Sequence, residues 1–229
     1  MSDTVRSRQK TDGDNCSPAG RVTRSLLGYG VVAGPFYVIV ALAQALLRPG
    51  FDLAHDDVSL LSNGSLGWIQ IANFVLTGVM VIACSVGLAR ALGSGPGATW
   101  APRLIAVYGA GLVAAGIFVA DPMNGFPAGA PAGRPDAITV HGILHIAAAG
   151  IGFLGLICAC MVMPRRFAAE KRRMWTTFSI VTGIAFVVAF GGVASGSSSA
   201  AVVLGFWAAL ILAWAWLDAV SVHLYRGIR

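Results

Sequence analysis

Long apolar stretches separated by shorter polar connections make up most of this chain. Six of the stretches are long enough to cross a bilayer, because a spanning helix needs about 20 mostly apolar residues. They cover residues 26–48, 66–90, 103–121, 138–162, 175–195 and 200–222. This pattern predicts an all-α membrane protein, a six-span transmembrane helical bundle in which residues 25–225 form one domain.

The two ends of the chain are polar. Residues 1–24 show no apolar periodicity and are predicted to form a disordered tail. Residues 226–229 form a short C-terminal end. The first apolar run begins at Leu26 and is long enough to span. We therefore expect it to be a membrane helix of the mature protein and not a cleaved signal peptide.

Composition agrees with the membrane class. Hydrophobic residues make up 56% of the 229 residues and charged residues 11%, and the mean hydropathy is +0.75. The chain has one Glu and two Lys, too few to cover an ordinary water-soluble surface with charge. We therefore expect the lipid bilayer to be the main partner of this protein.

The formal net charge of +6 raises the question of nucleic-acid binding, and the positions of the charges answer it. Fourteen Lys and Arg residues lie before span one, around the connection between spans two and three, between spans four and five, or after span six. Only Arg48 and Arg134 lie in the other connections. This asymmetry predicts that both termini are cytoplasmic. It explains the basic residues as topology signals, so no nucleic-acid partner is expected.

The strongest candidate for chemistry is the start of span four. His141 and His145 are four residues apart, so on a helix they project from one face. The predicted topology brings His55 of the first outer loop and Asp121 at the end of span three to the same membrane surface. Because zinc sites take three or four such ligands, we predict that His141, His145, His55 and Asp121 are possible zinc ligands. The spacing alone is weak evidence, since Gly142 stands where the helical zinc motif has Glu.

A metal at this surface suggests hydrolysis of a lipid-like substrate. A metal-bound water could attack an ester or amide, and the candidate catalytic residues beside it are Ser59, Asp57 and Asp121. A small transporter or a proton or ion relay through the same groups is the second functional hypothesis. The third is structural, because Asp121 and one histidine can form a hydrogen-bond network that fixes helix register. The sequence leaves open whether the ligand is a small molecule or a lipid.

A stripe of polar residues on span two has two interpretations. Gln70, Asn73 and Thr77 follow one another at spacings of three and four residues and therefore share one helix face. They either bond to a neighbouring helix, as Gln44 of span one is also expected to do, or form a wall of the pocket beside His141.

Four short motifs together resemble the bacterial membrane proteins grouped as domain of unknown function 998. They are His55-Asp56-Asp57-Val58-Ser59-Leu60-Leu61-Ser62, Gly67-Trp68-Ile69-Gln70-Ile71-Ala72-Asn73-Phe74, Asp121-Pro122-Met123-Asn124-Gly125-Phe126-Pro127 and His141-Gly142-Ile143-Leu144-His145. The resemblance covers roughly residues 28–222. It implies a six-span integral membrane protein without an established activity. We expect a multi-pass protein of the bacterial inner membrane. It makes Ser59, Asp121, His141 and His145 worth testing.

Overall fold

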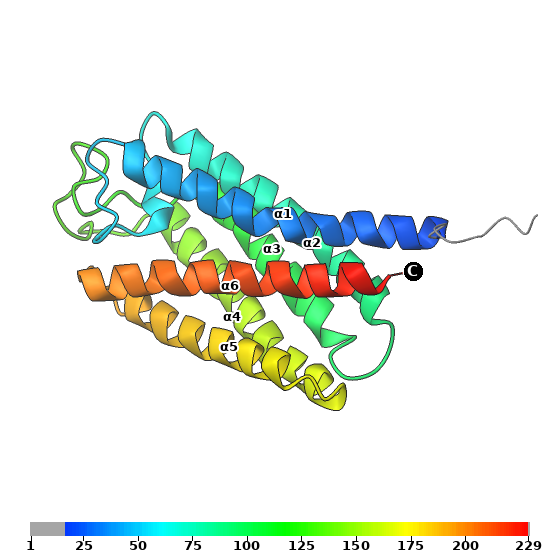
Figure 1. Ribbon diagram of the computed structural model, residues 1–229. Helices are drawn as coiled ribbons and strands as arrows, with labels where there is room; N and C mark the ends of the chain where they lie inside the picture. Colours follow the sequence, from blue (N-terminus) through cyan, green and yellow to red (C-terminus); the bar gives the residue numbers. More distant parts are fainter. Residues whose placement is uncertain (1–16, 229) are drawn as a thin grey trace, which may run out of the picture.

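The computed structural model describes residues 17–228, and in this part of the chain six long helices form a single bundle (Figure 1). Their bounds are α1 Pro18–Leu47, α2 Gly67–Leu92, α3 Trp100–Ile117, α4 Val140–Ala169, α5 Arg173–Ala194 and α6 Ala200–Gly227. All six are long and apolar enough to span a membrane. The all-α, six-span prediction is therefore confirmed.

The first helix begins earlier than its apolar stretch. The Ser17 hydroxyl accepts a hydrogen bond from the Gly20 main-chain N–H, and Pro18 occupies the first turn. Both are typical of helix starts, since they satisfy or remove N–H groups that lack a helical partner. Residues 18–24, predicted as part of the tail, therefore belong to α1. The rest of the predicted tail, residues 1–16, lies outside the described residues.

The helices pack in a ring in which sequence neighbours touch and α6 returns to α1. Both described ends of the chain lie at one end of the bundle, which we call the terminal end (Figure 1). The opposite end, called the loop end, carries the connections 48–66, 118–139 and 195–199. The first of these contains a short 3-10 helix, η1, at Val58–Ser62.

Glycines allow α3 to approach both of its neighbours closely. A Cβ added to Gly111 would lie 2.6 Å from the Cα of Gly152 on α4, and one added to Gly109 would lie 2.8 Å from the carbonyl oxygen of Gly78 on α2. Small residues permit this packing in membranes, where helices gain little from burying apolar surface against each other. Gly155 of α4 takes part in the same packing, since an added Cβ there would lie 2.8 Å from the Leu104 carbonyl oxygen of α3.

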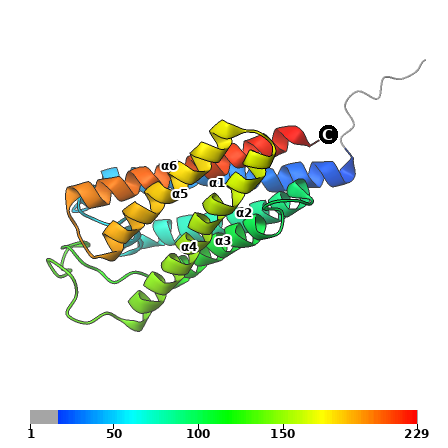
Figure 2. The same ribbon diagram turned by 90° about the horizontal axis from the view of Figure 1, so that it is seen from below.

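α4 and α5 meet near the terminal end and diverge toward the loop end, as the two perpendicular views both show (Figure 1, Figure 2). The contact is close where Gly183 of α5 faces Cys160 of α4, with 3.0 Å between an added Cβ and the Cys160 Cβ. Nearer the loop end, an added Cβ at Gly150 would meet only the tip of Phe190, at 3.9 Å. This divergence opens the inside of the bundle at the loop end.

Candidate functional site

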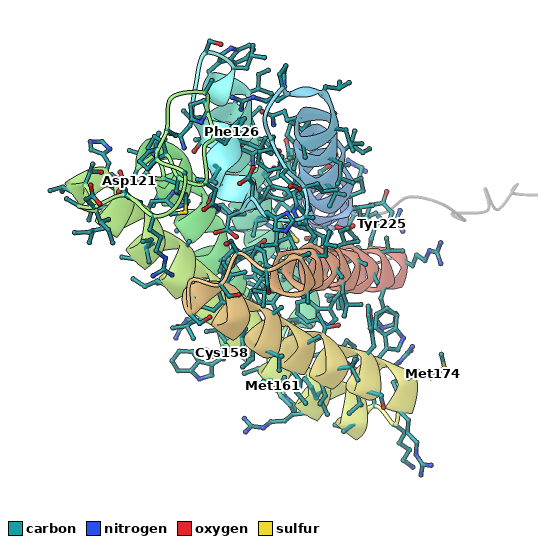
Figure 3. All side chains as sticks on the ribbon, turned by 90° about the vertical axis from the view of Figure 1, so that its left-hand side faces the viewer. Asp121, Phe126, Cys158, Met161, Met174 and Tyr225 are labelled. Carbon is teal, nitrogen blue, oxygen red and sulfur yellow. The ribbon has the colours of Figure 1, made fainter. Side chains whose placement is uncertain are left out.

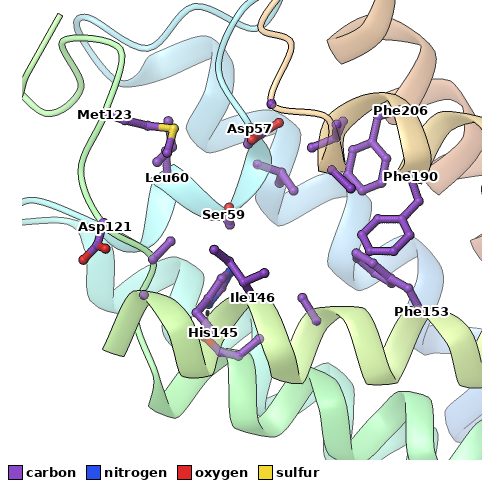
Figure 4. A pocket seen from close by; sticks show the side chains of 18 of the residues that line it. Asp57, Ser59, Leu60, Asp121, Met123, His145, Ile146, Phe153, Phe190 and Phe206 are labelled. Carbon is purple, nitrogen blue, oxygen red and sulfur yellow. Dashed lines mark hydrogen bonds between the residues drawn. The ribbon is translucent and has the colours of Figure 1, made fainter. Parts of the chain in front are cut away.

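A cavity of about 570 Å³ opens from the loop end into the bundle. Its size is typical of pockets for small molecules. Polar groups lie toward the loops and aromatic rings lie deeper, between α4, α5 and α6 (Figure 4). Its lining includes His55, Asp57, Ser59, Asp121, Arg134, Gly142, His145, Ala149, Phe153, Phe190, Gly196, Ser198, Phe206 and Leu210.

His145 lines this cavity although its side chain is only 5% exposed. Its Nδ1 lies 3.0 Å from the carbonyl oxygen of Ala115 and 2.7 Å from that of Phe118, at the end of α3. A carbonyl oxygen can only accept, so Nδ1 carries the hydrogen in this arrangement. In the neutral ring Nε2 then keeps its lone pair. Within residues 17–228 no hydrogen bond reaches Nε2.

His141 lies on the exposed side of α4 and packs edge-on against Phe118, with 5.9 Å between ring centroids. It does not line the cavity. Residues four apart differ by about 40° around a helix axis. α3, which covers His145, ends at Ile117, so the first turn of α4 extends beyond it. The two histidines therefore do not act on one point, in contrast to what their spacing suggests.

Asp121 is engaged in a structural contact at the start of α4. Its carboxylate accepts hydrogen bonds from the Thr139 main-chain N–H at 2.8 Å and from the Thr139 hydroxyl at 2.6 Å. The same hydroxyl accepts from the Gly142 N–H at 3.0 Å, which caps α4. Figure 3 shows Asp121 beside this helix start. A Cβ on Gly142 would lie 2.1 Å from the Asp121 carboxylate, which explains glycine at the position where a zinc motif has Glu.

His55 is exposed in the first loop at the mouth of the cavity. Its Nδ1 is 2.8 Å from an Asp52 carboxylate oxygen. A hydrogen bond from the main-chain N–H of Ala54 and then one from His55 lower the pKa of Asp52. Asn124 of the second loop donates to the His55 carbonyl oxygen at 3.3 Å. The two loops are therefore bonded to each other beside the cavity.

The four predicted zinc ligands are not gathered into one group. Among residues 17–228, no three His, Cys, Asp or Glu side chains lie close enough to share a metal ion. His141 is turned away from the cavity, and Asp121 is occupied by Thr139. The zinc site stays a prediction that this geometry does not support.

Asp57 and Ser59, two of the predicted catalytic residues, lie on the connection 48–66 at the loop end and line the cavity. Burial, followed by the charge of Asp56, raises the pKa of Asp57 to about 6, while the nearby charge of Arg134 acts in the opposite direction. Ser59 belongs to η1, whose neighbours Leu60 and Leu61 are buried. Figure 4 shows Asp57 and Ser59 on the side of the cavity facing His145.

Arg48 at the end of α1 holds η1 in place. Its guanidinium donates to the carbonyl oxygens of Leu61 and Asn63 and lies 4.8 Å from the centre of the Phe126 ring. Phe126 belongs to the second loop and is buried. One side chain therefore joins both long connections, and Ser59 is presented on a fixed element.

The polar stripe of α2 bonds helices together and does not line the cavity. Gln44 of α1 donates to the Gln70 side chain at 2.8 Å, and Asn73 donates to the Tyr37 carbonyl oxygen at 3.2 Å. Of the two interpretations of this stripe, the structural one is confirmed.

The model of the family described as "Protein of unknown function (DUF998)" matches residues 31–223. The chain belongs to this family. No match was found among curated proteins or among solved structures. The family resemblance seen in the four motifs is confirmed, and all four lie within the matched DUF998 region.

In this DUF998 protein, sequence reasoning missed two sets of cavity residues. Arg134 was interpreted only as a charge that sets topology, yet its guanidinium lies over Gly196, where an added Cβ would overlap it. The second set is aromatic: the Phe153 ring packs edge-on against Phe190 and Phe206, with ring centroids 5.2 Å and 5.9 Å away. Arg134 could have been found as the single basic residue of its connection. The phenylalanines carry no such signal, since lipid-facing positions are equally apolar.

Proposed function

We propose that this membrane protein binds one amphipathic, lipid-like molecule in the loop-end cavity. The observation that carries the proposal is the change of the lining with depth. Asp57, Ser59 and Arg134 lie at the mouth, whereas Phe153, Phe190 and Phe206 lie inside. A pocket with one polar and one apolar end fits a molecule of the same build, with its headgroup at the mouth and its chain among the rings.

The depth of the cavity favours binding of a ligand over its transport across the membrane. The deepest lining residue of α6, Leu210, is ten residues from the start of that helix, which is about 15 Å along its axis. The hydrocarbon layer is about 30 Å thick. The lining thus reaches about halfway, which suits a ligand that enters and leaves on one side.

The proposed orientation has the loop end outside the cell, in a bacterial inner membrane, with both termini in the cytoplasm. The distribution of Lys and Arg supports it, since Arg48 and Arg134 are the basic residues of the loop-end connections. In a cysteine-free background, a cysteine at Ser198 should react with an impermeant maleimide in intact cells. A cysteine at Lys171 should react only after lysis, and the reverse result would contradict the orientation.

The binding proposal is tested by native mass spectrometry of the full-length protein purified in detergent. We expect one lipid-sized adduct per chain. Ala149→Phe places a ring inside the cavity and should lower the bound fraction at least about tenfold, a loss of roughly 1.4 kcal/mol. Ala147→Phe is the matched control, because Ala147 is exposed on the same helix and does not line the cavity. Equal adducts in both variants, or none in the wild type, would contradict the proposal.

A further inference from the structure

The unpartnered nitrogen of His145 is the feature of the cavity that the binding proposal does not use. The side chain is buried and lines the cavity, and its Nδ1–H is held by two main-chain carbonyls. Binding an apolar chain requires no such group. An imidazole with a fixed tautomer and a free Nε2 lone pair at the wall of a cavity can act as a general base.

Ser59 supplies the group that such a base would act on. Its hydroxyl makes no hydrogen bond within residues 17–228, whereas its carbonyl oxygen accepts one from the Ser62 hydroxyl at 2.6 Å. The residue is half-buried on η1, lines the same cavity and faces His145 (Figure 4). Arg48 fixes the carbonyl end of η1. The hydroxyl is therefore presented from a rigid element.

We infer that the cavity hydrolyses a carboxylic ester of a lipid-like molecule, with Ser59 as nucleophile and His145 as general base. The inference rests on the proposed binding function. Activated serines elsewhere combine the same three kinds of group, namely a nucleophile, a base and a group that orients the base. No hydrogen bond joins Ser59 to His145 within residues 17–228, so the proton transfer requires the two side chains to approach each other. The carbonyls of Ala115 and Phe118 orient the imidazole, as a carboxylate does in many enzymes.

The reaction balances with water as the only co-reactant. The Ser59 oxygen bonds to the ester carbonyl carbon while its proton passes to Nε2 of His145. The carbon–oxygen bond to the alcohol then breaks, and the alcohol leaves with the proton from Nε2. Water next attacks the acyl-serine and gives one proton to Nε2. That proton returns to the Ser59 oxygen as the fatty acid is released.

The test treats the purified full-length protein with a fluorophosphonate that carries a long alkyl chain. The adduct is mapped by peptide mass spectrometry and its rate of formation is followed. We expect labelling at Ser59 and none in Ser59→Ala. His145→Asn keeps an N–H near the position of Nδ1 but removes Nε2, so labelling should slow at least about a hundredfold. Ser65→Ala, an exposed serine of the same loop, and His141→Asn should both label at the wild-type rate.

The outcomes separate the inference from the function on which it rests. Labelling at another residue, or at Ser59 with the same rate in His145→Asn, overturns the inference. So does an unlabelled wild type that still carries its lipid adduct, and that result leaves the binding function intact. Thermal unfolding of each variant identifies loss of fold. If His145→Asn unfolds, Ser59→Ala still tests the inference. It should remain folded, because the Ser59 hydroxyl makes no hydrogen bond to a described residue.

Discussion

Single residues at the loop end owe their roles to what packs beside them. His141 and His145 are chemically identical and four residues apart, yet one is exposed and the other is buried with its Nδ1 bonded. The sequence indicated that both share a helix face, which is true to within about 40°. It could not indicate that α3 ends where it covers His145 but not His141. The position of this helix end determines which of the two histidines is buried beside the cavity.

Asp57 should make the stability of the protein depend on pH. Its pKa in the folded protein, about 6, lies above the ordinary value of 3.8. Between these values the folded state holds more protons than the unfolded state, so stability falls as pH rises from about 4 to 6 and is constant above. The change is about 3 kcal/mol, since each pKa unit corresponds to about 1.4 kcal/mol. The difference in unfolding midpoint between wild type and Asp57→Asn, measured from pH 4 to 8, should show this step.

Asp52→Asn is the matched control for this prediction. The pKa of Asp52 is lowered by its hydrogen bonds, so its contribution to stability is lost only as pH falls below about 4. Its difference curve should be flat from pH 5 to 8. A flat curve for Asp57→Asn over the same range as well would show that its carboxyl group is not buried as described.

Whole elements were predicted better than their ends. The six helices follow from the lengths of the apolar stretches, because only about 20 such residues span a bilayer. η1 was not predicted, since five residues carry too little periodicity. α3 ends at Ile117 and not near 121, because the chain turns there to place Asp121 against the start of α4. Contacts between elements, which the local pattern does not contain, set these ends.

The start of α4 depends on the close approach of Asp121 to Gly142. In Gly142→Ala, the new methyl group would displace the carboxylate from Thr139 and remove a helix cap, at a cost of about 1 kcal/mol. The thermal midpoint should fall by about 2–4 °C. Gly150→Ala on the same helix has space for the methyl group and should unfold at the same temperature or higher. In an Asp121→Ala background, Gly142→Ala should no longer destabilise. If it still does, the contact with Asp121 is not the cause.

At the scale of the whole molecule, the divergence of α4 from α5 creates the cavity (Figure 2). Apolar periodicity shows that a helix spans but not how far two helices separate, so the cavity and its phenylalanines had no signal in the sequence. The polar mouth was partly predictable, because topology brings the loop-end connections together. Asp57, Ser59 and His145 were among the predicted residues and do line the cavity.

The most direct test of the central claim is to map where a lipid chain lies. A fatty acyl lipid with a photoreactive diazirine at the end of its chain is added to the purified protein, irradiated, and the cross-linked residues are identified by peptide mass spectrometry. Binding in the cavity predicts cross-links at Phe153, Phe190 and Phe206, and their loss in Ala149→Phe but not in Ala147→Phe. Cross-links confined to exposed outer positions such as Ile143, Leu154 and Ile211 would contradict it.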